Sequence, residues 1–149
     1  MWQPHPDCSP TCEVIGLDPD AESIRQARRA AQETDLGERI SFVAETSATY
    51  RDPEGFDLIA ACDCIHDFAA PERTLAEIGA LLRPGGTLFV LEPRAGDRLE
   101  DNIHPLGTVY YGFSLFHCMT QSLAEGGPGL GTCMGPAQTI DLLRRPGFN

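Results

Sequence analysis

Apolar runs alternate with helical patterns along most of the chain. The run at 13–18, EVIGLD, is rich in β-branched and aliphatic residues and predicts a buried strand. Asp20 can cap a helix over 21–34, which Gly37 is expected to close. A second strand is predicted at 40–44. A strand, a helix and a strand in this order favour parallel pairing with a right-handed crossover.

A second series of the same kind follows. The run at 56–62, FDLIAAC, is so apolar that it predicts a strand buried on both faces of a parallel sheet. An amphipathic helix is predicted from Pro71, and the Pro-Gly-Gly sequence at 84–86 is expected to end it. The segment at 87–92, TLFVLE, predicts another strand buried on both faces. The expected fold class is therefore α/β, a parallel sheet flanked by helices.

The sequence changes character after residue 92, where glycines and aromatic residues appear without a steady period. A helix is expected within this region at 110–125, a loop at 126–131, and a last helix at 137–145. One partial domain is expected, with an irregular start at 1–12, an α/β core at 13–92, an insertion at 93–135 and a helical end at 136–149.

Composition limits the kinds of partner. A chain of 149 residues with 42% hydrophobic residues and a mean hydropathy of -0.19 is typical of a soluble domain, and no segment approaches the length of a membrane span. The net charge of -11 argues against a nucleic-acid partner, because phosphate binding needs clustered Lys and Arg. The first residues lack the pattern of a signal peptide, so we expect a cytoplasmic location.

The six cysteines are interpreted as thiols, because the chain is too long and too regular for a disulfide-stabilised mini-protein. Cys62, Cys64 and His66 alternate, so they would share one face if the strand extended that far. A zinc site could then take a fourth ligand from Cys118 or His117. No paired Cys-x-x-Cys spacing supports such a site, so we expect buried thiols and no metal.

Two segments carry a family resemblance. VIGLDPD at 14–20 and the segment at 56–92, which includes LLRPGG before a strand, resemble the Rossmann-like class of S-adenosylmethionine-dependent methyltransferases. The resemblance covers roughly 13–92. It implies a Rossmann-like fold, S-adenosylmethionine as cofactor and a small-molecule methyl acceptor. The segment at 99–135 is similar to one in bacterial methyltransferases that carry a winged-helix domain ahead of the catalytic domain, where it covers the substrate side of the pocket.

The sequence also departs from that family. The family's first strand with its glycine-rich loop is not recognised before residue 13, and the final strands are not recognised after PGFN at 146–149. We therefore expect a domain that is cut at both ends. Such a chain could be inactive alone, a non-catalytic remnant, a homo-oligomer, or a half-domain completed by a partner chain. An NAD(P)-dependent oxidoreductase is a further alternative, which LLRPGGTLFVLE disfavours.

The predicted cofactor contacts follow three strands. In the family that the chain resembles, an acid in the place of Asp18 binds the ribose hydroxyls. Polar residues after the second strand could reach the adenine, although such residues often form only a turn. Residues that end the third strand lie at the edge where ligands of such sheets bind. The full set is Asp18, Glu45, Thr46, Ser47, Cys62 and Asp63.

Methyl transfer depends mainly on placing the acceptor close to the donor, and it needs a base only if the acceptor loses a proton. His66 is the first candidate for that base and His117 the second, with Asp67 and Glu92 weaker. Four aromatic residues could line an apolar acceptor pocket, or could simply pack in the core: Tyr110, Tyr111, Phe113 and Phe116.

Overall fold

A computed structural model describes residues 12–34 and 39–149 of the chain. The chain divides into two compact units, residues 1–50 and 51–149. Each unit is described by itself.

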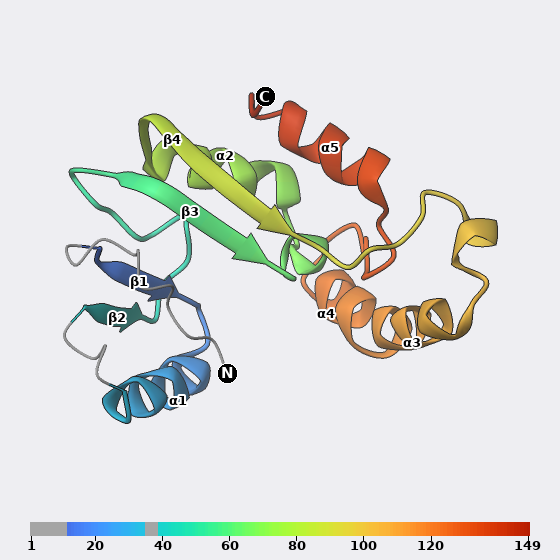
Figure 1. The fold of residues 1–149 in the computed structure, drawn as a ribbon, viewed down its shortest axis with the longest axis horizontal. Helices are drawn as coiled ribbons and strands as arrows, with labels where there is room; N and C mark the ends of the chain where they lie inside the picture. The colour runs from blue at the N-terminus through green and yellow to red at the C-terminus, as the bar shows by residue number, and fades with distance from the viewer. Residues whose placement is uncertain (1–11, 35–38) are drawn as a thin grey trace. The chain divides into compact units, whose positions relative to one another are not determined.

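The first unit contains one strand-helix-strand motif. Strand β1 (Val14–Leu17) and strand β2 (Ile40–Val43) pair in parallel, and helix α1 (Ala21–Gln32) connects them (Figure 1). This confirms the predicted order and pairing of these elements. The predicted helix end at Gly37 and the predicted irregular start, except residue 12, lie outside the described residues.

Local contacts explain the shape of this motif. The Asp20 carboxylate accepts a hydrogen bond from the Ser23 N–H at 2.7 Å and so caps α1 as predicted. The Arg28 guanidinium donates to the Phe42 carbonyl oxygen at 2.6 Å, which ties α1 to β2. The Phe42 ring also lies against Gly16, where a Cβ atom would come within 2.4 Å of Cδ1. A larger residue at this point of β1 would therefore force the Phe42 ring to move.

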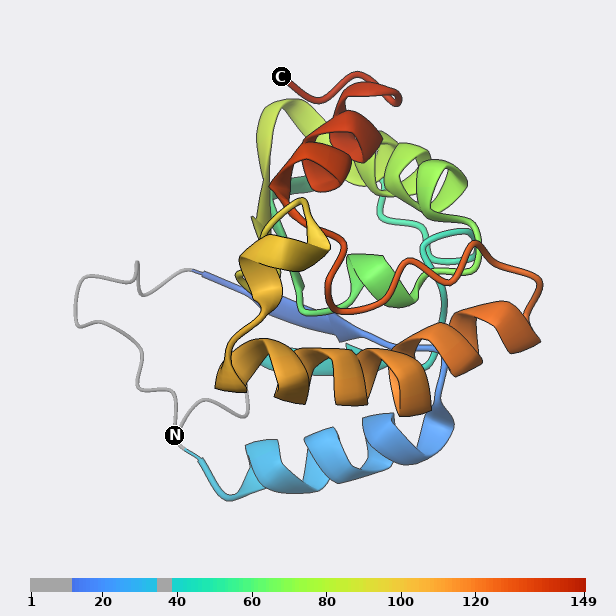
Figure 2. The ribbon, with the colours of Figure 1, turned by 90° about the vertical axis from the view of Figure 1, so that its right-hand side faces the viewer.

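The second unit is built on another parallel pair. Strand β3 (Phe56–Cys62) pairs with strand β4 (Leu82–Leu91), and helix α2 (Pro71–Leu81) connects them. Helix α5 (Pro136–Arg144) packs beside α2, as Figures 1 and 2 show. The buried core of this unit consists of Ala61, Ile65, Leu75, Ile78, Met134 and Leu142.

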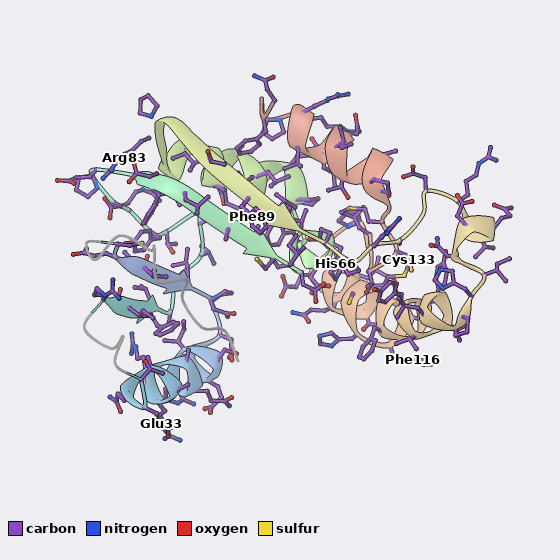
Figure 3. All side chains as sticks on the ribbon, in the orientation of Figure 1. Glu33, His66, Arg83, Phe89, Phe116 and Cys133 are labelled. Atoms are coloured by element: carbon purple, nitrogen blue, oxygen red, sulfur yellow. The ribbon has the colours of Figure 1, made fainter. Side chains whose placement is uncertain are left out.

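The predicted burial of β3 and β4 on both faces is wrong within the second unit. The face that carries Ala61 packs against α2 and α5. On the opposite face, Leu58 is 59% exposed and Leu91 55% exposed, and Phe89, which Figure 3 labels, is 51% exposed. Successive side chains of a strand point to opposite faces, so an unbroken apolar run does not tell which faces are covered.

The junction between α2 and β4 also differs from the prediction. The Pro-Gly-Gly sequence at 84–86 was expected to precede the strand, but β4 already begins at Leu82. Leu82 pairs with Phe56, and Thr87 pairs with Leu58. The stretch between the two pairs therefore forms a bulge inside β4. Proline and glycine fit regular strand pairing poorly and are common at bulges, so the Pro-Gly-Gly sequence favours this irregularity.

A long helical region follows β4. A 3-10 turn η2 (Leu99–Asn102) leads to helix α3 (Pro105–Phe113), a π-helical segment η3 (Ser114–Cys118) and helix α4 (Met119–Ala124), which follow one another in Figure 2. The helix predicted at 110–125 therefore exists but begins earlier. Among the described helices, none has both the length and the apolar composition needed to cross a bilayer.

Candidate functional site

Asp18 follows β1 directly, at the carboxyl end of the strand. Its N–H donates to the Val43 carbonyl oxygen at 3.3 Å, and its Oδ1 accepts the Asp20 N–H at 2.7 Å. These bonds hold the carboxylate just ahead of α1. The other oxygen, Oδ2, makes no hydrogen bond with any residue that the structure describes. The geometry leaves it able to accept a ligand hydroxyl.

Glu45, Thr46 and Ser47 follow β2, the parallel neighbour of β1, so they lie at the same edge of this pair as Asp18. Thr46 opens a turn, because its carbonyl oxygen accepts the Thr49 N–H at 3.1 Å. Its own N–H donates to the Thr49 Oγ1 at 3.2 Å. Glu45 and Ser47 are half-buried. The turn that sequence reasoning left open as an alternative is therefore present at Thr46.

Cys62 and Asp63 lie at the carboxyl end of β3. Cys62 is exposed, and the side chain of Asp63 is 71% exposed. Asp63 has a φ of 55°, a left-handed conformation that Asp tolerates better than most residues, and its N–H donates to the Leu91 carbonyl oxygen at 2.7 Å. This turn leads the chain from β3 into the 3-10 segment η1 (Ile65–Asp67).

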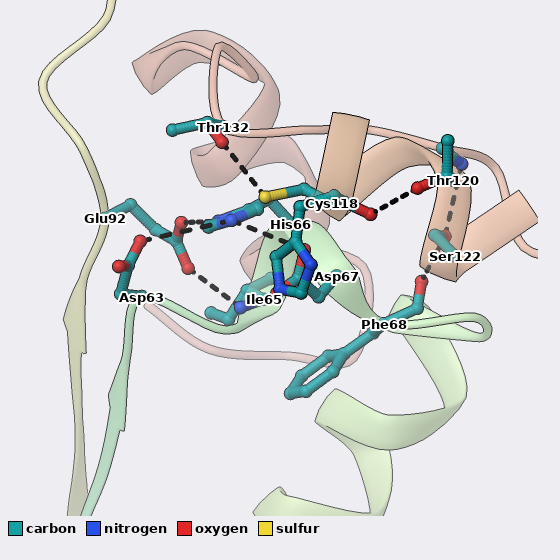
Figure 4. A network of polar contacts seen from close by, with 12 residues as sticks. Asp63, Ile65, His66, Asp67, Phe68, Glu92, Cys118, Thr120, Ser122 and Thr132 are labelled. Carbon is teal, nitrogen blue, oxygen red and sulfur yellow. Dashed lines mark hydrogen bonds and ion pairs between the residues drawn. The ribbon is translucent and has the colours of Figure 1, made fainter. Parts of the chain in front are cut away.

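His66 lies on η1 and is almost completely buried, with 2% of its surface exposed. Its Nδ1 is in close hydrogen-bond contact with the Glu92 carboxylate, whose other oxygen accepts the Ile65 N–H at 2.8 Å. Its Nε2 lies 3.5 Å from the Asp67 Oδ1 and 4.0 Å from the Asp63 Oδ1 (Figure 4). Three carboxylates therefore surround a single buried imidazole.

These carboxylates determine the protonation of His66. Burial alone would lower its pKa, but the hydrogen bond and charge of Glu92, together with the charges of Asp67 and Asp63, raise the pKa above the ordinary value of 6.5. Because Glu92 engages Nδ1, any base or ligand chemistry at this residue would use Nε2.

The segment η1 is attached to α4 and to the loop that follows it. Ser122, which is 1% exposed, donates its hydroxyl to the Phe68 carbonyl oxygen at 3.2 Å and accepts the Gly129 N–H at 3.3 Å. The Gly131 N–H donates to the His66 carbonyl oxygen at 3.3 Å. These bonds bring the end of η3 next to His66.

Cys118 is the residue that this attachment brings to His66. It is 6% exposed, and its Sγ lies 3.2 Å from the Thr132 Oγ1. Its Sγ, a ring nitrogen of His66 and an oxygen of Asp67 all lie within 4.8 Å of one another. The Asp67 Oδ1 is buried, yet it finds no hydrogen-bond donor among the residues placed by the structure. Burial, assisted by Asp67, raises the pKa of the Cys118 thiol.

The zinc ligand set considered from the sequence is assembled only in part, because His66 and Cys118 come together without the other candidates. No donor group among the described residues joins Cys62 or Cys64 to His66. Burial, with the charge of Glu92 next in effect, raises the pKa of Cys64 to about 12. Cys64 is therefore a protonated, half-buried thiol, whereas Cys62 is exposed, contrary to the expected burial.

His117 lies in a different environment, on η3. It lines an open groove of about 620 Å³, and the groove is apolar around it. Phe113 is 61% exposed and Phe116, which Figure 3 labels, is 82% exposed, and both line the same groove. The predicted tyrosines do not line it, and the Tyr111 hydroxyl lies 3.4 Å from the Asn102 Nδ2. The complete lining is Val109, Gly112, Phe113, Phe116 and His117.

Sequence reasoning ranked Glu92 low and missed Thr132. The position of Glu92 carried a usable signal, because β3 and β4 are parallel and their carboxyl ends meet at one edge. A residue just after β4 is therefore expected to lie near the residues just after β3. The contact between Cys118 and Thr132 depends on a loop between α4 and α5, and no sequence pattern indicates it.

Residues 2–88 match the family model described as "Methyltransferase domain". The chain belongs to this family. The matched residues include Asp18 and both parallel strand pairs except the last residues of β4. The resemblance to S-adenosylmethionine-dependent methyltransferases that residues 13–92 carry is therefore confirmed.

Relatives of this methyltransferase-domain chain are longer proteins. It is 25% identical over 105 residues to the sterol 24-C-methyltransferase of Clavispora lusitaniae, covering 70% of this chain and 28% of that protein. It is 30% identical over 91 residues to a probable S-adenosylmethionine-dependent methyltransferase of Saccharomyces cerevisiae, covering 57% of this chain and 31% of that one. The chain thus spans about a third or less of these relatives.

A solved structure supports the same family. Human N-acetylserotonin methyltransferase, in complex with S-adenosylmethionine, superposes with a TM-score of 0.64 at 25% identity. The match covers 94% of this methyltransferase-domain chain and 36% of the human chain. The predicted Rossmann-like α/β class is confirmed.

Proposed function

We propose that this chain is the cofactor-binding core of an S-adenosylmethionine-dependent methyltransferase that acts on a small-molecule acceptor. The observation that carries the proposal is the match of residues 2–88 to the methyltransferase domain. The yeast relative is a probable S-adenosylmethionine-dependent methyltransferase and the human structure contains S-adenosylmethionine, which supports this molecule as the cofactor. The oxidoreductase alternative is not favoured, since the matched family is a methyltransferase family.

In the first unit, Asp18 would accept the ribose hydroxyls. A carboxylate oxygen can accept two hydrogen bonds, and Asp18 needs only Oδ1 to hold its own turn. Its place directly after a parallel strand is where ribose-binding acids of such sheets lie. The residues present therefore fit the diol of the cofactor.

The adenine contacts are proposed for Glu45, Thr46 and Ser47. The half-buried Glu45 carboxylate is the best acceptor of the three for an amino group, whereas the Thr46 N–H is already engaged in its turn. We propose Cys62 and Asp63, in the second unit, as further cofactor contacts. Their support is their place at the carboxyl end of β3, where ligands of such sheets bind.

The bound cofactor would supply an electrophilic methyl group on a sulfonium sulfur. The chain would orient the acceptor and, for an acceptor that must lose a proton, supply a base. His117 is the proposed base on the acceptor side, because it lines the groove with Phe113 and Phe116. These two rings would favour an apolar or aromatic acceptor. His66 is the other proposed base, acting through Nε2, while Glu92 holds its ring.

Location and assembly are further proposals. The five described cysteines are free thiols, which supports a reducing compartment such as the cytoplasm. The exposed Leu58, Phe89 and Leu91 on one face of the β3–β4 pair support association, with a second copy or with a complementing chain.

The test is calorimetric titration of S-adenosylmethionine into the chain and into the Asp18→Asn variant. The amide oxygen of the introduced asparagine can still accept the Asp20 N–H, so the turn is kept while the charged acceptor is lost. A hydrogen bond to a charged group contributes about 1.5–3 kcal/mol, so we expect the affinity to fall roughly 10- to 100-fold.

The matched control is Glu22→Gln, which removes one charge from the exposed first turn of α1 in the same unit. We expect it to bind as the wild type does. Equal loss in both variants, or no binding by a folded wild-type chain, would contradict the proposal for this chain.

A further inference from the structure

Three metal-ligand types converge at the buried end of η1. They are a ring nitrogen of His66, a carboxylate oxygen of Asp67 and the thiol sulfur of Cys118, all within 4.8 Å of one another. The first two come from η1 and the third from η3, about fifty residues later in the chain. His66 and Cys118 are 2% and 6% exposed, so the donors do not form a solvated surface cluster.

The contact between His66 and Glu92 determines which nitrogen is available. Glu92 uses one oxygen for the His66 Nδ1 and the other for the Ile65 N–H. A neutral His66 that donates from Nδ1 presents the lone pair of Nε2. Histidines that bind metals commonly donate their other ring N–H to a carboxylate in this way, which fixes the tautomer and the ring orientation.

Asp67 provides an independent observation. Its Oδ1 is buried and accepts no hydrogen bond from the described part of the chain, so only the ion-pair contact with the His66 ring offsets the cost of burying it. It lies 3.5 Å from the His66 Nε2. Two donor atoms bound tetrahedrally at about 2.0–2.2 Å from an ion lie roughly 3.3–3.6 Å apart. The observed separation fits an ion placed between them.

We propose that His66, Asp67 and Cys118 form a binding site for a divalent transition metal, with zinc as the best fit. Nitrogen, oxygen and sulfur donors together suit zinc, which tolerates all three in a tetrahedral arrangement. One thiolate and one carboxylate would balance the two positive charges of the ion. Binding would release to solvent the Cys118 thiol proton and, from the doubly protonated form of His66, the Nε2 proton, while His66 keeps its proton on Nδ1.

The surrounding residues have distinct places in this site. Glu92 would support His66 without contacting the metal, since both of its oxygens are engaged. Thr132, 3.2 Å from the Cys118 Sγ, would donate its hydroxyl to the thiolate. The fourth position would be taken by water or by Asp63, whose Oδ1 lies 4.0 Å from the His66 Nε2 and whose side chain is mostly exposed.

This inference does not depend on the proposed methyl transfer, and it competes with one part of it. The Nε2 atom of His66 cannot accept a proton from a substrate while it binds a metal ion. If the site binds metal, His117 is left as the proposed base.

The experiment is titration of the full chain with Co²⁺, a spectroscopic probe of zinc sites, followed by displacement with Zn²⁺. We expect one equivalent to bind, with the ligand-field absorption of a tetrahedral site and a thiolate charge-transfer band. Cys118→Ser should abolish the charge-transfer band, and Asp67→Asn should weaken binding at least about tenfold. The matched control is Cys133→Ser, a half-buried cysteine outside the donor group, which should leave the spectrum unchanged.

Circular dichroism of each variant separates loss of the site from loss of the fold. Zn²⁺ should also raise the unfolding temperature of the wild type and of Cys133→Ser, and should raise that of Asp67→Asn less at the same concentration. The proposal is overturned if the folded wild type binds no equivalent of Co²⁺. It is also overturned if Cys118→Ser keeps the charge-transfer band, because the band would then come from another cysteine.

Discussion

His66 and His117 are both predicted as bases from the sequence, and the second unit places them in opposite surroundings. His66 is 2% exposed and lies among the carboxylates of Glu92, Asp67 and Asp63. His117 is exposed and lines an apolar groove beside Phe113 and Phe116. Residue type therefore identifies both as candidates, and only their neighbours tell what each can do.

A similar contrast occurs between two neighbouring residues of η3. His117 and Cys118 are adjacent on η3, yet His117 faces the groove while Cys118 is buried against Thr132. Consecutive residues of a helix point in different directions, so one segment can contribute to an apolar groove and to a polar cluster together. Two kinds of chemistry are thus available along a single helical segment.

The largest expected effect comes from breaking the pair between Glu92 and His66. Glu92→Ala would leave His66 without its partner and the Ile65 N–H without its acceptor, inside a buried site. Removing one member of a buried pair typically costs about 3–5 kcal/mol of unfolding free energy. We expect a loss in this range by urea denaturation in the presence of a chelator.

The matched variant for this comparison is His117→Ala, which removes the exposed histidine. We expect its unfolding free energy to stay within about 0.5 kcal/mol of the wild type. Similar losses of unfolding free energy in Glu92→Ala and His117→Ala would show that the pair between Glu92 and His66 stabilises the fold no more than the exposed His117 does.

The comparison also shows which features of the structure can be predicted from the sequence. The strand-helix-strand order, the Asp20 cap and the place of Asp18 all follow from local patterns, since they depend on residues close together in the chain. The pair between His66 and Glu92 joins two strand ends and was predictable only once parallel pairing was assumed. The bond between Cys118 and Thr132 depends on loop packing, for which the sequence carries no local signal.

The exposed face of the β3–β4 pair is another feature that the sequence does not predict. Ala61 and Leu58 are both apolar residues of β3, but Ala61 is 4% exposed and Leu58 is 59% exposed. Hydrophobicity alone predicts burial for both. Which of them is covered depends on where α2 and α5 pack, and that is a property of the tertiary structure.

A smaller effect is expected from pH. The folded-state pKa of His66 is raised above 6.5, so below pH 6.5 its contribution to stability is fully present. As pH rises above that value, the unfolded chain releases the proton first, and the stability falls until the folded pKa is passed. The slope for one proton is at most about 1.4 kcal/mol per pH unit.

Urea denaturation at a series of pH values above 6.5, in the presence of a chelator, measures this slope. His66→Gln should lose most of it, because the titrating group is gone, whereas His117→Gln should keep it. A wild-type stability that rises with pH across this window would contradict the raised pKa.

The smallest expected effect on stability comes from the groove. Phe116 is 82% exposed, so Phe116→Ala removes little buried surface and should change the unfolding free energy by no more than about 0.5 kcal/mol. If the groove receives an apolar acceptor, the same variant should reduce binding of an aromatic probe, because the ring contributes contact area only when a ligand covers it. Leu123→Ala is the matched control, since Leu123 is 53% exposed on α4 and does not line the groove. Equal probe binding by both variants would show that the exposed rings are not an acceptor site, and the functional contrast between His117 and His66 would lose its main support.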